Sequence, residues 1–355
     1  MLTAVDLFAG GGGLTVGLKR AGFAVVAAAE NDPHACATYS ENHPEVRMLP
    51  CDVRELDDSR WRWLAVDVGG VDLLAGCPPC QGFTSLTSKY RRSDPRNDLV
   101  AEMSRVAEAL RPKMIMMENV VGLSRRGNEL YADLVKQLER LGYELTEGVL
   151  EVADFGVPQR RRRLVLLGGL GFSVKLPDPT HSRKVSEGSL PWRTVREAIS
   201  DMHKPHTLAE ARKGQGLEPG DWHVVRNLSE LNLKRIRTVK AGETWSSIPE
   251  EMRPECHRGG YRGFTNVYGR MEWDKPSPTI TGGCTTFSKG RFGHPVEDRT
   301  ISVREAALLQ TFPGDYKFVT PYMEKVCNII GNALPCDFAE AVSRQCRMEL
   351  DRHGR

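Results

Sequence analysis

The sequence has little that would suit a membrane, secreted or fibrous protein. No apolar run among its 355 residues approaches the ~18 residues that a membrane-spanning helix needs, and Met1–Val5 carry no basic region of a secretion signal. Cysteine is scarce, at nine residues, and its odd number and scattered positions argue against a disulfide scaffold and for a reducing cytosol. The formal net charge of +3 indicates no partner for the chain as a whole.

Length and local charge are more informative. A chain of 355 residues exceeds the roughly 250–300 residues at which single cores stop growing, so we expect one large domain and a smaller one. Between Pro158 and Lys213 there are twelve Lys or Arg against five Asp or Glu, and Arg160–Arg163 are consecutive. Such an excess suits a polyanionic partner, with a solvated basic face as the alternative.

The first half of the chain alternates short apolar runs with amphipathic stretches, which predicts an α/β fold with a mostly parallel sheet covered on both faces. The expected strands are Leu2–Phe8, Phe23–Ala29, Val71–Ala75, Met114–Met117, Val149–Val152 and Leu164–Leu167. The expected helices here are Leu14–Ala21, a helix that starts near Asp32-Pro33, and Leu99–Leu110.

After about Gly171 this alternation is lost. Seven prolines from Pro177 to Pro254 interrupt irregular, glycine-rich sequence with short helical pieces such as Leu228–Val239, which predicts a loop-rich second domain. Helical periodicity returns in Val303–Phe312 and Cys336–Leu350.

A glycine cluster, Gly10–Gly13, follows the first expected strand and lets a ligand approach the backbone and a helix N-terminus. Glu30 ends the second strand, where an acidic side chain can accept hydrogen bonds from both hydroxyls of a ribose. Thr15 and Val16 stand where a dinucleotide fingerprint needs its third glycine. We therefore expect a nucleoside-type ligand without pyrophosphate, most commonly S-adenosylmethionine; a purely structural turn is the alternative.

Cys77 and Cys80 follow the expected strand Val71–Ala75, at the edge where open α/β sheets bind ligands. The pair can bind zinc together with Cys256-His257, form a thioredoxin-like redox pair, or present one nucleophilic thiolate on a proline-stiffened turn. Glu118 follows another strand at the same edge. A cysteine and a glutamate there can converge on one bound ring, as nucleophile and proton-sharing partner.

Five short motifs occur in an order that resembles the DNA (cytosine-5) methyltransferases. The resemblance spans Val5 to Pro335, apart from an unmatched region from about Gly171 to Arg262. The motifs are Asp6-Leu7-Phe8-Ala9-Gly10-Gly11-Gly12-Gly13, Pro78-Pro79-Cys80-Gln81, Glu118-Asn119-Val120, Gln159-Arg160-Arg161-Arg162-Arg163 and Gly331-Asn332-Ala333-Leu334-Pro335.

The resemblance implies a Rossmann-like methyltransferase sheet with a smaller, loop-rich target-recognition domain. Residues 1–176, completed by 301–355, would form the catalytic domain, and residues 177–300 the target-recognition domain. It implies further that Cys80 adds to C6 of a cytosine flipped out of duplex DNA while Glu118 hydrogen-bonds the N3 side of the ring. Arg161 and Arg163 would complete the catalytic set, with Arg163 at the base carbonyl.

The resemblance also implies the S-adenosylmethionine site, whose product is S-adenosylhomocysteine. Phe8 would lie against the adenine, Glu30 would hold the ribose, Asp52 the adenine amino group and Asn332 the methionine end. The other expected cofactor residues are Gly10, Gly12, Asn31, Val53, Pro79 and Leu99; no metal is expected.

Two further expectations concern neighbours of the nucleophile. Cys77 has no catalytic counterpart in the family, and we expect it to pack. Thr84–Asn97, polar and basic, is similar to the family's mobile loop that closes over DNA.

The expected partners are double-stranded DNA and a cognate restriction endonuclease acting on the same site, with no membrane, a monomeric state and a cytoplasmic location. The rivals are a tRNA cytosine-5 methyltransferase, a binding-only relative that has lost catalysis and a nicotinamide oxidoreductase. The basic, unmatched region favours DNA over tRNA, because sequence-specific duplex reading needs such an insert.

Overall fold

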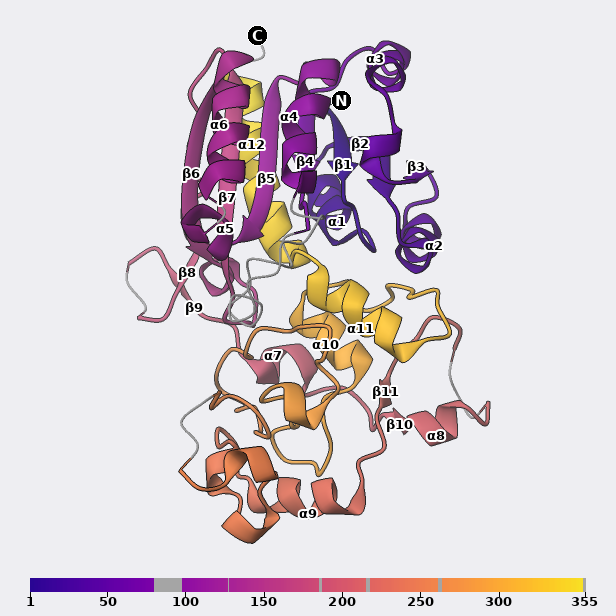
Figure 1. The fold of residues 1–355 in the computed structure, drawn as a ribbon, viewed down its shortest axis with the longest axis vertical. Coiled ribbons are helices and arrows are strands. Elements are labelled where there is room, and N and C mark those ends of the chain that lie inside the picture. The colour runs from indigo at the N-terminus through magenta and orange to yellow at the C-terminus, as the bar shows by residue number, and fades with distance from the viewer. Residues whose placement is uncertain (80–97, 127, 185–186, 215–217, 261–263, 354–355) are drawn as a thin grey trace. The chain divides into compact units, whose positions relative to one another are not determined.

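The computed structural model describes residues 1–79, 98–126, 128–184, 187–214, 218–260 and 264–353, and they form two compact units (Figure 1). The first unit is Met1–Phe155, Arg162–Pro179 and Leu334–Arg355, and the second is Gly156–Arg161 and Thr180–Ala333. The predicted domain limits differ from these units mainly at 301–333. That stretch lies in the second unit, where α10 (Val303–Leu309) packs against both α7 (Val195–Ile199) and α11 (Met323–Asn332).

The first unit is built on a seven-stranded sheet in the order β3-β2-β1-β4-β5-β7-β6. All pairings are parallel except those of β7, which runs antiparallel to both β5 and β6. The α/β prediction is therefore confirmed. The strands are β1 (Thr3–Leu7), β2 (Ala24–Glu30), β3 (Arg47–Pro50), β4 (Leu73–Gly76), β5 (Met114–Val120), β6 (Tyr143–Glu151) and β7 (Arg162–Leu170).

Helices cover this sheet: α4 and α6 lie in front of it in Figure 1, and α12 lies behind it. On the α12 side, Gly17 lets α1 approach α12 closely, because a Cβ at this position would lie 2.6 Å from the Ala339 carbonyl carbon. The helices are α1 (Gly13–Arg20), α2 (Pro33–Asn42), α3 (Asp58–Asp67), α4 (Leu99–Leu110), α5 (Gly122–Arg126), α6 (Asn128–Arg140) and α12 (Cys336–His353).

The sheet edges are where the structure departs from the sequence prediction. β3 was not predicted, and β6 starts at Tyr143 rather than Val149. Both are edge strands whose residues are largely half-exposed or exposed, so neither carries the apolar run that marks the central strands.

The second unit has short elements joined by long loops, as predicted. Besides α7, α10 and α11, its described elements include β8 (His181–Ser182), β9 (Leu190–Pro191), β10 (His206–Thr207), α8 (Leu208–Ala211), β11 (Val224–Val225) and α9 (Glu230–Thr238).

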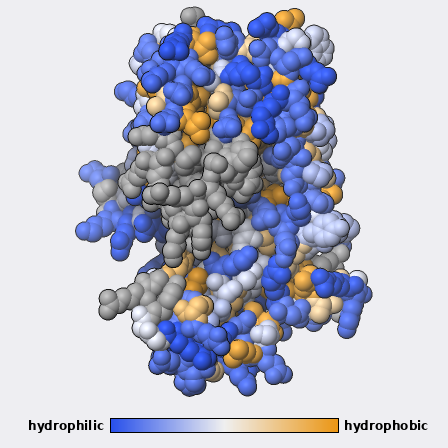
Figure 2. All heavy atoms as spheres, viewed as in Figure 1, coloured by the Kyte–Doolittle hydropathy of each residue, from blue (hydrophilic) through white to orange (hydrophobic). Residues whose placement is uncertain are grey.

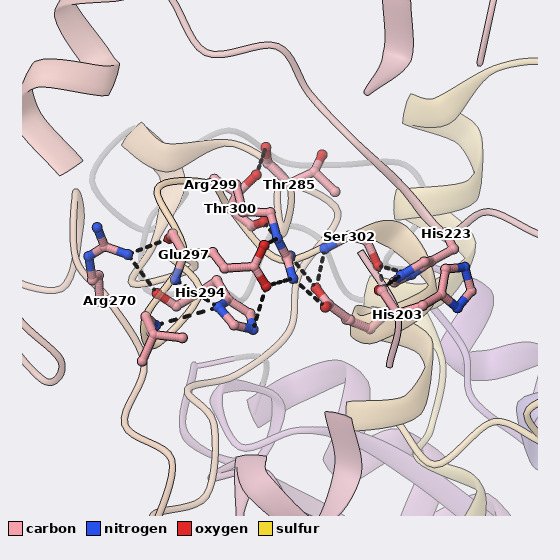
Figure 3. Close-up of polar contacts among 11 residues, drawn as sticks. His203, His223, Arg270, Thr285, His294, Glu297, Arg299, Thr300 and Ser302 are labelled. Carbon is pink, nitrogen blue, oxygen red and sulfur yellow. Dashed lines mark hydrogen bonds and ion pairs between the residues drawn. The ribbon is translucent and has the colours of Figure 1, made fainter. Parts of the chain in front are cut away.

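Buried arginines hold these loops together. Arg270, only 4% exposed, donates to the backbone carbonyls of Ile236, Val239, His294 and Glu297 and to the Asp298 carboxylate. A continuous polar network around it is drawn in Figure 3, where Arg299 bridges Glu297 and the buried Glu305. The loops thus obtain from side chains the hydrogen bonds that strands would otherwise supply.

Hydrophilic side chains predominate on the face drawn in Figure 2, and apolar ones are scattered across it. Among the described residues, no helix combines the length and apolar character needed to cross a membrane.

Candidate functional site

The glycine loop after β1 is tied directly to the end of β2. The backbone N–H of Gly10 donates to Glu30 Oε2 at 2.9 Å, while Glu30 Oε1 accepts from the N–H groups of Asn31 and Asp32. Phe8, Gly10 and Gly12 all have positive φ, of 58°, 55° and 92°, and this conformation is unusual for a bulky residue such as Phe8. The hydrogen bond from Gly10 therefore fixes the glycine loop relative to the Glu30 side chain at this edge of the sheet.

A buried polar group that the sequence analysis missed lies beneath this loop. Thr15 Oγ1 donates to Asp6 Oδ2 at 2.7 Å and lies 2.7 Å from the Tyr39 hydroxyl. Asp6 is fully buried, and its Oδ1 makes no hydrogen bond within the described part of the chain. Burial, reinforced by the nearby Glu30 carboxylate, raises the pKa of Asp6 to about 7. The sequence did contain a signal for this buried acid, because Asp6 is the first residue of the motif that ends in the glycine cluster.

Asp52 and Val53 follow β3 at the neighbouring strand end. Asp52 caps a short 3-10 turn, and its carboxylate accepts from the backbone and the guanidinium of Arg54, which lowers its pKa. Arg105 on α4 donates to the Val53 carbonyl at 2.9 Å. Val53 and Leu99, the first residue of α4, are both buried. These contacts fix the turn against the helix.

Glu118 and Arg163 meet at the ends of β5 and β7. Arg163 Nε lies 2.5 Å from Glu118 Oε1, and both side chains are nearly buried, at 13% and 8% exposure. The antiparallel register places Val120 opposite Arg163, so Glu118 and Arg163 are near neighbours on adjacent strands. Paired in this way, Glu118 can accept a hydrogen bond from a ligand or share a proton with it. Arg163 presents a positive charge at a fixed position beside it.

Asn119 anchors the segment that leads to Cys80. Its Nδ2 donates to the Pro78 carbonyl at 3.0 Å in a buried bond, and its Oδ1 accepts from the Val120 N–H. Pro79 is half-buried beside it. Cys80 itself and the predicted loop Thr84–Asn97 lie outside the described residues. The sequence analysis named Asn119 as part of a motif but assigned it no role.

Cys77 is placed at the same edge as Glu118. Burial raises the pKa of its thiol well above the usual value, and the Glu118 carboxylate and Asp6 raise it further. A thiol in this state is a poor nucleophile.

The second unit contains the other predicted site residues. The Arg161 guanidinium is buried on the carbonyls of Ile280 and Gly331, and Gln159 accepts from the Ile280 N–H. A Cβ at Gly331 would lie 2.2 Å from the backbone of Gly282, so this contact requires glycine. Asn332 ends α11 and is exposed. The Gln-x-Arg and Gly-Asn-Ala motifs are thus joined within this unit.

No cluster of three or more metal-ligating side chains occurs among the residues that the structure describes. Cys256 Sγ lies 3.1 Å from His257 Nδ1, so the two candidate zinc ligands are close together. Among the described residues they have no further ligands with which to form a tetrahedral zinc site.

Comparison with known proteins decides the family. The model of the C-5 cytosine-specific DNA methylases matches residues 2–348. The chain belongs to this family. It is 38% identical to the type II methylase M.HgiDII of Herpetosiphon aurantiacus, covering 98% of this chain and 95% of the relative. It is 35% identical to the type II methyltransferase M1.HphI of Haemophilus parahaemolyticus, covering 96% and 86%.

Solved structures agree on the fold. A prophage-encoded protein of E. coli matches with a TM-score of 0.73 at 22% identity over 99% of this chain and 100% of that one. The S. pombe Dnmt2 methyltransferase matches with a TM-score of 0.58 at 18% identity over 99% of both chains.

Family membership confirms the predicted activity. The methylase is a DNA (cytosine-5) methyltransferase that uses S-adenosylmethionine and acts on DNA. The nicotinamide-oxidoreductase alternative is thereby set aside.

Proposed function

We propose that the methylase forms 5-methylcytosine through a covalent adduct between Cys80 and C6 of a cytosine in a specific duplex sequence. The observation that carries this proposal is the Glu118–Arg163 pair at the end of β5, the same strand end from which Asn119 holds Pro78. Pro78 and Pro79, the two residues before Cys80 in the sequence, lie at the edge where the acid and the arginine lie, which supports Cys80 as the nucleophile.

The chemistry explains why these three groups belong together. C5 of cytosine is a weak nucleophile because the ring is aromatic. Addition of the Cys80 thiolate to C6 places electron density on C5, while Glu118 at N3 and Arg163 at the carbonyl stabilise the charge that develops on the ring. When bound, S-adenosylmethionine supplies the methyl group. Loss of the C5 proton then lets Cys80 leave by elimination.

Arg161 has a different role in this proposal. Its guanidinium is already engaged by two backbone carbonyls, so we assign it to positioning the Gly331-Asn332 segment rather than to the base.

The residues of the first unit fit the cofactor. A carboxylate offers about four lone-pair sites. The Glu30 and Asp52 carboxylates each accept three hydrogen bonds within the described residues, which leaves room for a ribose hydroxyl at Glu30 and the adenine amino group at Asp52. Phe8, Gly10, Gly12, Asn31, Val53, Pro79 and Leu99 complete the proposed set in this unit. Asn332, a residue of the second unit, stays a prediction from the family resemblance.

The second unit is the proposed target-recognition region, covering at least residues 180–300. Its loop-rich construction and local basic excess suit a surface that reads duplex DNA after base flipping. Because the relatives M.HgiDII and M1.HphI are type II enzymes, we also propose that the methylase protects a site cut by a cognate restriction endonuclease. It would act as a monomer in the cytoplasm, where chromosomal DNA is its substrate.

The experiment that tests the substrate is incubation with labelled S-adenosylmethionine and either duplex DNA or tRNA. We expect label in DNA alone, and bisulfite sequencing of an expression host should then give a single recurring sequence. Label in tRNA alone would favour the RNA rival, and binding to DNA without label would favour the binding-only relative.

A further inference from the structure

We propose that Cys77 is a positioning residue for Glu118: its thiol donates a hydrogen bond to the carboxylate and, together with Arg163, fixes the orientation in which Glu118 meets the cytosine ring. This inference rests on the proposed role of Glu118. It goes beyond the packing role expected from the sequence.

Strand register places the two residues side by side. In the parallel pairing of β4 with β5, Gly76 is opposite Met117, so the next residues of the two strands are Cys77 and Glu118. The backbone N–H of Cys77 donates to the Leu7 carbonyl at 3.3 Å, which extends the β1–β4 pairing to Cys77. A Cβ at Gly76 would lie 2.7 Å from the Met103 sulfur, so the end of β4 packs closely against this side chain of α4.

Polar side chains follow one another across four adjacent strands at this edge of the sheet. Asp6 on β1, Cys77 after β4, Glu118 on β5 and Arg163 on β7 follow the order of the strands. Arg163 Nε contacts Glu118 Oε1 from one side, and the register places Cys77 beside Glu118 on the other side. Cys77 and Arg163 therefore flank the carboxylate from the two neighbouring strands.

The state of the thiol determines what it can do. Burial and the two nearby carboxyl groups raise the pKa of Cys77 well above its usual value, so the sulfur keeps its proton at neutral pH. A protonated thiol is a weak hydrogen-bond donor. A serine hydroxyl can replace it in this role, whereas the methyl groups of valine fill similar space without donating.

The test compares Cys77→Ser with Cys77→Val in single-turnover methyl transfer to duplex DNA. Loss of one donor to a charged group predicts a fall of roughly 10-fold for Cys77→Val and near-normal rates for Cys77→Ser. In separate steady-state measurements, the KM values for DNA and S-adenosylmethionine should stay unchanged in both variants. Should Cys77→Val fail to fold, Cys77→Ala, which also lacks a donor, takes its place.

Controls separate this inference from the function on which it rests. Cys51, a half-buried free cysteine just after β3, gives the matched pair Cys51→Ser and Cys51→Val, for which we expect no difference. Full activity in Glu118→Ala would overturn the proposed role of Glu118 and the inference with it. An inactive Glu118→Ala together with a normal Cys77→Val, or equal losses in Cys77→Ser and Cys77→Val, would overturn the inference alone.

Discussion

The two units satisfy their backbone polar groups in different ways. In the first unit, seven paired strands use most carbonyls and N–H groups, and side chains at the strand ends remain available for chemistry. In the second unit, buried side chains do this work: Arg161, Arg270 and Arg304 together donate to eight backbone carbonyls. The first unit therefore depends on regular strand pairing, and the loops of the second unit depend on a few buried arginine side chains.

The largest expected effect follows from removing one such cation. Arg270→Met leaves four buried carbonyls without their donor, and we expect the second unit to lose about 3–5 kcal/mol of unfolding free energy. Urea unfolding followed by tryptophan fluorescence measures this, because four of the six tryptophans lie in the second unit.

The matched control uses the same acidic partner. Arg237 also pairs with Asp298, but its side chain is 63% exposed. Arg237→Ala should cost about 0–1 kcal/mol. Equal losses in the two variants would show that burial of Arg270 is not what holds these loops.

The next prediction concerns a buried acid in the first unit. Asp6 has a folded pKa of about 7 against an ordinary value of 3.8. The unfolded chain releases this proton at lower pH, so stability falls as pH rises from about 4 to about 7, and the full cost remains above pH 7. Between pH 4 and pH 8, the titration of Asp6 lowers the unfolding free energy by about 3–4 kcal/mol, and Asp6→Asn removes this pH-dependent loss. Hydrogen exchange of β1 in the cofactor-free chain at several pH values should reveal a flatter dependence in the variant; identical slopes would contradict the assignment.

A smaller effect is expected at the end of β5, where Asn119 holds Pro78, two residues before the proposed nucleophile in the sequence. Asn119→Ala leaves the Pro78 carbonyl without its buried partner, at a cost of about 1–3 kcal/mol. If that cost falls on the transition state, kcat drops about 5- to 150-fold. Asn42, whose Nδ2 donates to the Thr38 carbonyl on α2, supplies a control: Asn42→Ala should keep full activity. A normal kcat in Asn119→Ala would remove the positioning role of this residue.

The same difference between the units explains what the sequence could predict. The central strands and α4, predicted as Leu99–Leu110 and found with those bounds, carry apolar runs or helical periodicity that one chain displays directly. Glu118 and Arg163 belong to motifs in fixed order. By contrast, the roles of Arg270 and Gln159 depend on carbonyls far away in the sequence, such as those of His294 and Leu309, and no local pattern marks them. Cys77 is an intermediate case. The sequence shows the motif in which it stands, but only the strand register shows that it lies beside Glu118.

The central claim is that Cys80 alone forms the covalent bond to cytosine. Replacement of the C5 hydrogen by fluorine removes the proton that must leave before Cys80 can be eliminated. Duplex DNA with 5-fluorocytosine at the target position, incubated with S-adenosylmethionine, should therefore give a denaturant-stable complex. Mass spectrometry should place the nucleotide on the peptide that contains Cys80, and Cys80→Ala should abolish the complex. No adduct on a confirmed target sequence, or an adduct on Cys77 or Cys284, would contradict the account.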